Sequence, residues 1–118
     1  MLFRLAAAGA AIAVLVHIAA LASPSFDALL YSSTYPWWRH VLFIWIDATL
    51  ACLLPRPPSW LVWPYGALTL QVLYSHGLGG WHERQRTGRF HWIDVVAVVA
   101  VPLLLAVLVA DRRTRRTH

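Results

Sequence analysis

The sequence predicts an all-α integral membrane protein, a bundle of four transmembrane helices. Of its 118 residues, 59% are hydrophobic and only 13% are charged, which is far too apolar for an ordinary soluble domain of this length. The mean hydropathy is +0.58. Four apolar segments each approach the length of about 20 residues that crosses roughly 30 Å of hydrocarbon. They are residues 2–22, 38–54, 59–77 and 91–110, and we expect residues 1–118 to form a single transmembrane domain.

The first segment, residues 2–22, has two readings. Arg4 followed by an apolar run and then Ala20-Leu21-Ala22 resembles a cleavable signal peptide. His17, however, is unusual in the apolar part of a signal peptide. We therefore expect this segment to be retained as the first transmembrane helix.

Proline, serine and glycine mark the three connections between the segments. The first connection runs from Ser23-Pro24 to Tyr35-Pro36 and is predicted to be a structured loop. The second, Pro55-Arg56-Pro57-Pro58, is so short that it predicts a hairpin between antiparallel helices. The third, residues 77–89, is rich in glycine at its start and charged at its end, which predicts a loop that is mobile where it leaves the third helix.

All ten basic residues are arginines, and they flank the apolar segments. No nucleic-acid-binding motif accompanies them, so we interpret them as topology signals and lipid-headgroup contacts. With the N-terminus in the cytoplasm, Arg4, Arg56, Arg112, Arg113, Arg115 and Arg116 lie inside, and Arg39, Arg84, Arg86 and Arg89 lie outside. The positive-inside rule therefore predicts cytoplasmic N- and C-termini. The lone Cys52 excludes an internal disulfide.

Asp47 is the most informative single residue, because it stands within the apolar segment 38–54. An ionisable side chain at the bilayer centre costs about 2.5 kcal/mol or more, so such residues are functional by default. At 1.5 Å per residue, Asp47 lies about 14 Å from the outer end of its helix and Gln71 about 18 Å from the inner end of the third. These depths are nearly equal, which predicts a hydrogen bond between the two side chains.

The remaining polar groups gather toward the outer surface in this topology. His17 and Tyr74 lie between that surface and the level of Asp47, and His40 shares a helix face with Asp47, seven residues away. The pattern predicts a polar vestibule that ends at Asp47 and binds an apolar ligand with a cationic or protonatable group. A purely structural alternative is one interhelical hydrogen bond between Asp47 and Gln71 that fixes packing.

A second chemistry uses residues near the outer surface. Imidazole and carboxylate groups suit zinc, copper or iron. The candidate ligands are His76, His82, Glu83, His91 and Asp94. Their spacing matches no established metal motif, so metal binding is the alternative hypothesis. No hydrolase, phosphate-loop or dinucleotide motif occurs in the sequence, and no particular cofactor is implied.

The order of several residues resembles the EXPERA family, the four-helix membrane domain of sterol isomerases and the sigma-2 receptor. The similarity is carried by His17, Asp27, Tyr35-Pro36, Trp38, Asp47 and His82-Glu83-Arg84. The resemblance implies an intrabundle pocket for a sterol-like or cationic amphiphilic ligand, with Asp27 and Asp47 as acidic contacts. The loops are shorter here, and no intramembrane glutamate is present for isomerase chemistry. These departures favour binding over catalysis.

The sequence therefore predicts a polytopic membrane protein that binds a hydrophobic or amphiphilic molecule, and it leaves open whether a reaction follows. The expected partner is a membrane lipid or a sterol-like small molecule, and the expected ligand contacts are Asp47, His17, Gln71, Tyr74 and Asp27. The metal site and a non-catalytic subunit of a homo-oligomer or larger membrane complex are the alternatives.

Overall fold

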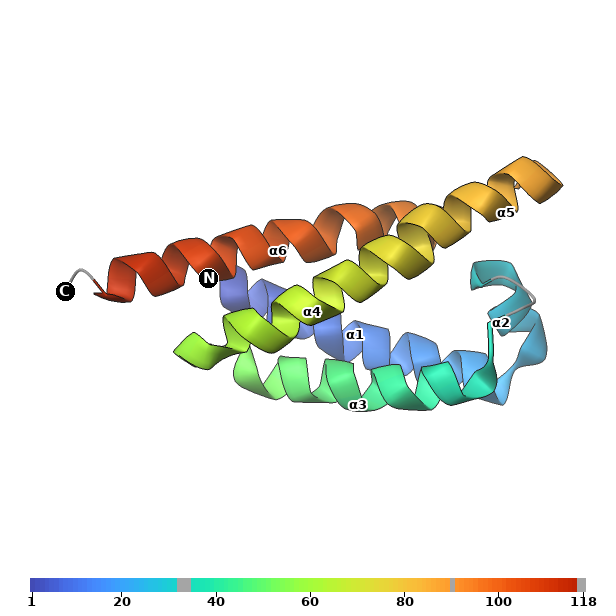
Figure 1. The fold of residues 1–118 in the computed structure, drawn as a ribbon. Helices are drawn as coiled ribbons and strands as arrows, with labels where there is room; N and C mark the ends of the chain where they lie inside the picture. The colour runs from blue at the N-terminus through green and yellow to red at the C-terminus, as the bar shows by residue number, and fades with distance from the viewer. Residues whose placement is uncertain (32–34, 90, 117–118) are drawn as a thin grey trace. The chain divides into compact units, whose positions relative to one another are not determined.

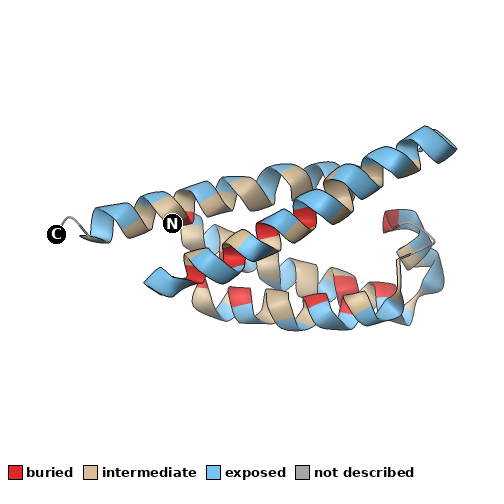
Figure 2. Ribbon diagram, in the orientation of Figure 1, coloured by how far each residue is buried: buried red, intermediate tan, exposed pale blue. Residues whose placement is uncertain are grey.

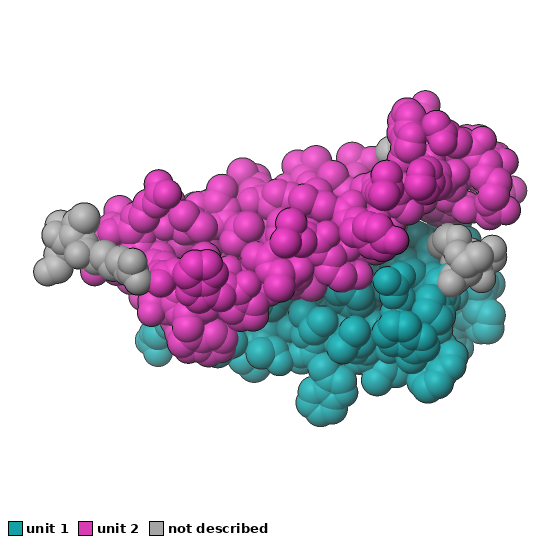
Figure 3. All heavy atoms as spheres, in the orientation of Figure 1, with its two compact units in different colours: residues 1–57 teal, residues 58–118 magenta. Residues whose placement is uncertain are grey.

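The computed structural model describes residues 1–31, 35–89 and 91–116, and these residues form helices and no strand. This confirms the predicted all-α class. The chain divides into two compact units, Met1–Pro57 and Pro58–His118 (Figure 3). The prediction of a single domain is not tested by this division.

In the first unit, α1 (Leu2–Ala22) packs against α3 (Trp37–Leu53), and the two run antiparallel (Figure 1). The bounds predicted for α1 are confirmed. α1 ends at Ala22 because Pro24 restricts the residue before it, and Ser23 has the extended dihedrals φ −138° and ψ 104°. The first helix therefore stops at the residue that the proline constrains.

The connection between α1 and α3 contains α2 (Pro24–Leu30), a seven-residue helix that the sequence did not predict as one. Ser23 caps it by accepting a hydrogen bond from the backbone N–H of Phe26 at 3.4 Å, and Pro24 occupies its first turn. The expected structured loop is thus partly helical. Residues 32–34 of that predicted loop lie outside the described residues.

α3 has 17 residues, which span about 25 Å at 1.5 Å per residue. It starts directly after Pro36, one residue earlier than predicted, and ends before the proline-rich turn. Thr49 bonds back to the carbonyl of Trp45 at 2.8 Å, so this hydroxyl is satisfied within the helix. Asp47 lies in the middle of this helix, directly after the apolar stretch of residues 41–46.

The second unit begins with η1 (Ser59–Leu61), a 3₁₀ turn, and continues into α4 (Val62–Val72) and the π-helical segment η2 (Leu73–Leu78). α4 and η2 pack against α6 (Trp92–Arg116). Leu61, Tyr65, Thr69 and Val72 are buried and recur every three or four residues, so they form one face (Figure 2). This face is the packed side of the second unit.

The prediction that residues 77–89 form a loop was wrong. The backbone stays helical through η2 into α5 (Gly79–Thr87). Gly79 adopts φ −62° and ψ −47°, ordinary right-handed helix values. Glycine lowers helix stability by only about 1 kcal/mol, and the arginines, glutamine and glutamate that follow are good helix formers. The helix therefore continues through the glycines.

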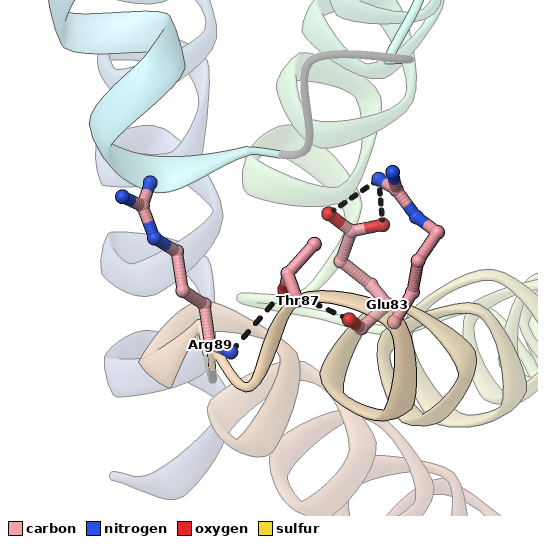
Figure 4. A network of polar contacts seen from close by, with 4 residues as sticks. Glu83, Thr87 and Arg89 are labelled. Carbon is pink, nitrogen blue, oxygen red and sulfur yellow. Dashed lines mark hydrogen bonds and ion pairs between the residues drawn. The ribbon is translucent and has the colours of Figure 1, made fainter.

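α5 ends in a glycine-capped turn. Gly88 has φ 70°, the left-handed conformation that glycine adopts without steric cost, and its N–H donates to the carbonyl of Arg84 at 2.8 Å. Thr87 donates to the carbonyl of Glu83, and the backbone N–H of Arg89 donates to the Thr87 hydroxyl (Figure 4). The actual connection to α6 is therefore only a few residues long.

α6 extends six residues beyond the predicted end at residue 110. Asp111 pairs with Arg115 at 2.9 Å, one helical turn later. The Arg112 guanidinium lies over the Trp63 ring of α4, 5.2 Å from its centroid. These contacts stabilise a helix that hydropathy alone ended too early. Pro102 lies inside α6 without ending it.

Two helices are long and apolar enough to cross a membrane, Leu2–Ala22 and Trp92–Arg115. Both helices carry exposed large apolar side chains, such as Leu5 on the first and Val96 on the second. α1, α3, α4 and α6 all carry exposed large apolar side chains, among them Leu15, Trp45, Leu70 and Val99. Exposed apolar side chains on four helices of a small protein are typical of contact with lipid or with other apolar surfaces.

Candidate functional site

The first unit contains a continuous line of four polar side chains. His17 Nδ1 and His40 Nδ1 are 3.0 Å apart and share a hydrogen bond. His40 Nε2 lies 3.0 Å from Asp27 Oδ1, and His17 Nε2 lies 3.8 Å from Asp47 Oδ2. We call Asp27, His40, His17 and Asp47, in that order, the acid–histidine line.

Three helices supply these four residues. His17 lies in the last turns of α1, Asp27 in α2, and His40 and Asp47 in α3. The prolines place α2 beside the ends of both long helices, and the α1–α3 packing brings His17 against α3. The packing of these three helices therefore brings together four residues that are distant in sequence.

The two histidines are buried and the two carboxylates are partly exposed. The His40 side chain is 2% exposed, whereas Asp27 and Asp47 are 30% and 16% exposed. His17 is also buried. Buried imidazoles need hydrogen-bond partners. Where two histidines face each other, the position of the ring proton decides which of them donates the hydrogen bond. The line thus has a dry centre and two accessible ends.

Aromatic rings surround the histidine pair. Tyr31 and Phe43 stack on His17 with centroids 5.7 and 5.5 Å away, and Tyr31 and Tyr35 also contact the His40 ring. Ring contacts of this kind fix orientation and exclude water. They hold the two imidazoles in position to bond through their Nδ1 atoms.

Tyr35 is half-buried and contacts the rings of Tyr31 and His40. Burial raises the pKa of Tyr35 to about 12, against an opposing effect of Arg39, whose guanidinium lies 5.4 Å from the ring centroid. The Tyr35 hydroxyl is therefore protonated at all physiological pH values. It is a hydrogen-bonding group and carries no charge.

One pair in the line is incompletely satisfied. Asp27 Oδ1 and His40 Nε2 are both buried atoms, and neither has a hydrogen bond of acceptable geometry, although they are 3.0 Å apart. An unsatisfied buried polar atom costs about 1–3 kcal/mol, more when charged. The unsatisfied atoms favour either a small rotation that completes the bond or a ligand group that bonds to both.

Of the predicted ligand contacts, the structure brings His17 and Asp47 together and joins Asp27 to them through His40. Gln71 and Tyr74 belong to the second unit, so their expected contacts with Asp47 stay predictions. Within its own unit Gln71 donates to the Ser75 hydroxyl at 3.3 Å. The Tyr74 side chain is exposed.

The predicted metal ligands are not gathered into one cluster. No group of three or more histidine, cysteine, aspartate or glutamate side chains that could hold a metal occurs within residues 1–31, 35–89 and 91–116. Glu83 instead receives two hydrogen bonds from Arg86, at 2.8 and 2.9 Å (Figure 4). His82 is exposed, and the His91 carbonyl accepts a hydrogen bond from the N–H of Asp94.

His76 and Asp94 form a separate pair in the second unit. His76 Nδ1 lies 2.7 Å from Asp94 Oδ1, which joins the π-helical η2 to the first turn of α6. A Cβ on Gly80 would lie 2.8 Å from Asp94 Oδ2 and 3.3 Å from Asp94 Cβ. The missing side chain at Gly80 therefore makes room for this ion pair.

Gly80→Ala is expected to destabilise the second unit despite the better helix propensity of alanine. Asp94 is short and held by His76, so its carboxylate has to move and the ion pair is lost. Gly66 is the matched control, because a Cβ there meets nothing within 4 Å. We expect thermal unfolding in detergent to show Gly80→Ala less stable than Gly66→Ala by about 1–2 kcal/mol. Equal stabilities would contradict the close approach.

Sequence reasoning missed the central role of His40, which was placed in the vestibule but left out of the ligand contacts. Its spacing of seven residues from Asp47 was the available signal, because it puts both on one helix face. The Tyr31 and Phe43 rings were missed as well. Nothing in the local sequence distinguishes them from ordinary core aromatics.

The fold and the acid–histidine line together define a helical protein with a buried acid–histidine site and two helices able to cross a membrane. Comparison with known proteins adds no closer assignment, since no family model, curated protein or solved structure matches the chain. The function has to be argued from the site itself.

Proposed function

We propose that this chain is a polytopic membrane protein that binds a hydrophobic or amphiphilic small molecule with a cationic group, at the acid–histidine line. The observation that carries this proposal is the pair of carboxylates, Asp27 and Asp47, at the two ends of a buried histidine pair. A carboxylate in apolar surroundings is costly unless it is paired, and a ligand ammonium group supplies that pairing.

The proposed membrane arrangement has four crossings with both termini in the cytoplasm. α1 and α6 have the required length, and α3 spans about 25 Å. Residues 59–78 are helical without a break, which supports a third crossing there. The orientation rests on the distribution of arginines, with the cluster near the C-terminus inside.

The apolar surroundings of the line support an amphiphilic ligand. Tyr31 and Phe43 pack on the histidines, and Trp45 on the same helix is exposed at the apolar surface. A ligand that enters from lipid meets apolar side chains first and the carboxylates afterwards. This order suits a molecule with an apolar body and one charged group. The resemblance to the EXPERA family points to the same ligand class.

Asp47→Asn is expected to weaken binding of such a ligand while leaving the fold intact. The probe is a fluorescent tertiary amine with a long alkyl chain, titrated into the protein in lipid nanodiscs and compared with the neutral alcohol of the same skeleton. We expect affinity for the amine to fall about 30-fold, because losing one partner of a buried charge pair costs about 2 kcal/mol or more. Affinity for the alcohol should change little.

Asp111→Asn is the matched control, since Asp111 pairs with Arg115 on α6 and belongs to the other unit. Asp27→Asn tests the second carboxylate in the same assay. If the amine binds wild type and both carboxylate variants of the line equally well, the proposed site is wrong. If the amine and the alcohol bind the wild type equally, the ligand is not recognised by its charge.

A further inference from the structure

The acid–histidine line has the geometry of a path for protons. Its four side chains follow one another in the order carboxylate, imidazole, imidazole, carboxylate, with separations of 3.0, 3.0 and 3.8 Å. We propose that this line transfers a proton between Asp27, at the partly exposed end, and Asp47, in the interior of α3. This activity goes beyond ligand binding and requires no ligand.

The hydrogen bond between the two histidines makes the line directional. A neutral imidazole carries one N–H, so only one of the two facing Nδ1 atoms donates and the other accepts. When His17 Nδ1 donates, His40 carries its single N–H proton on Nε2, toward Asp27, and His17 Nε2 presents a lone pair to Asp47. When His40 donates, every one of these positions is reversed.

Transfer of one proton interconverts these two arrangements. Starting with protonated Asp47, its proton passes to His17 Nε2, the His17 Nδ1 proton passes to His40 Nδ1, and the His40 Nε2 proton passes to Asp27. The result is an Asp47 carboxylate, a protonated Asp27 and two neutral histidines with exchanged tautomers. Each N–H or O–H bond that breaks is replaced by one that forms, so protons and charge balance.

The two end contacts need small movements before transfer. The distance of 3.8 Å between His17 Nε2 and Asp47 Oδ2 exceeds a direct hydrogen bond, so a side-chain rotation or one bridging water completes it. The contact between His40 and Asp27 has the right distance and the wrong angle, and a ring rotation corrects it. The histidine pair at the centre already has the required separation.

The groups around the line keep the proton on it. The titratable and charged groups that face it are Tyr31 from the end of α2, Tyr35 from the following loop and Arg39 from α3. The pKa of Tyr35, raised to about 12 by burial, excludes it as a proton donor near neutral pH. Arg39 is always charged and does not titrate there. Among the described residues, neither Tyr35 nor Arg39 therefore takes the proton from the line.

The line also connects two different environments. Asp27 belongs to the short α2 in the connection, and its side chain is 30% exposed. Asp47 lies ten residues after the first residue of α3, about 15 Å along the helix. The Asp47 side chain is 16% exposed against 30% for Asp27, so bulk solvent exchanges protons with Asp47 less readily. A relay therefore gives the interior carboxylate a route for exchange.

The test measures how fast Asp47 takes up a proton in the full-length, ligand-free protein in nanodiscs. A rapid drop in pH is followed by time-resolved infrared spectroscopy of the carboxylic acid band, and an Asp47→Asn sample identifies the band that belongs to Asp47. His40→Gln keeps a polar side chain and cannot relay a proton. We expect it to slow protonation of Asp47 about 100-fold, the scale of a positioned proton-transfer group.

Asp27→Asn should slow the appearance of the Asp47 band. Asp27→Glu should restore most of the protonation rate of Asp47, which a merely structural role of Asp27 would not require. His76→Gln, in the other unit, is the control and should leave the rate unchanged. Circular dichroism establishes which variants fold, and Asp27→Asn carries the test if His40→Gln does not. A wild-type rate in a folded His40→Gln or Asp27→Asn protein overturns the proposal, as does an Asp47 that never changes protonation.

Failure of the relay and failure of the proposed function are distinguishable, because the infrared experiment contains no ligand. If the wild type binds the amine and the alcohol equally well while His40→Gln slows protonation of Asp47, ligand binding by charge is refuted and the relay stands. If Asp47→Asn loses affinity for the amine while His40→Gln leaves the protonation rate of Asp47 unchanged, the line is a binding site without a relay.

Discussion

His40→Ala is expected to lower the free energy of unfolding of the first unit by about 3 kcal/mol, because it removes a buried polar partner of Asp27 and His17 and opens a cavity at the same time. His40 is 2% exposed and contacts His17, Asp27 and the rings of Tyr31 and Tyr35. Without it, buried Asp27 Oδ1 loses its nearest opposite group. The rings of Tyr31 and Tyr35 also lose their contact with the His40 ring.

Unfolding of the purified protein in mixed micelles by a denaturing detergent, followed by circular dichroism, measures this change. His82→Ala is the control, because His82 is exposed on α5. We expect its unfolding curve to coincide with that of the wild type. If His40→Ala were as stable as His82→Ala, the acid–histidine line would contribute nothing to the fold of the first unit.

Leu108→Ala is expected to destabilise the protein by about 3 kcal/mol, the usual scale for removing a buried leucine side chain and leaving part of the volume empty. Leu108 is 2% exposed on α6, the helix that packs against α4 and η2. α6 also carries Leu103, which is 64% exposed. The two leucines therefore test packing and apolar exposure separately on one helix.

Leu103→Ala should change the unfolding free energy by less than about 0.5 kcal/mol, as is usual for surface substitutions. In the proposed membrane arrangement, its neighbours are acyl chains that fill the vacated space. The same micelle titration measures both variants. Similar losses for Leu103→Ala and Leu108→Ala would mean that the exposed side of α6 is covered by protein rather than by lipid.

The candidate site was predicted in part. An acid inside an apolar segment is a strong signal in any sequence, which is why Asp47 stood out, and His17 and Asp27 were named with it. The partnership of His40 with His17 was out of reach, because it joins α1 to α3 across 23 positions of sequence. Hydropathy and spacing describe one helix at a time and cannot pair the faces of two.

The predicted metal ligands show how the backbone of a segment decides which of its side chains meet. His76, His82, Glu83, His91 and Asp94 are close in sequence, and a flexible loop would have let them converge. The continuous helix from η2 through α5 fixes their directions instead, so His76 reaches Asp94 while Glu83 binds Arg86. The segment is polar, as its composition indicates, but its backbone is helical and does not form the predicted loop.

The sequence by itself determined the all-α class, the bounds of α1 and the proline-rich ends of α1 and α3. These features depend on local chemistry, namely apolar length and the backbone restrictions that proline imposes. Tertiary structure alone decided that residue 80 has to lack a side chain, because a Cβ there would lie 2.8 Å from Asp94 Oδ2, which no local propensity records. It also decided which buried polar groups meet. A buried imidazole needs a partner, and only the packing of α1, α2 and α3 selects His40 for His17 and Asp27 for His40.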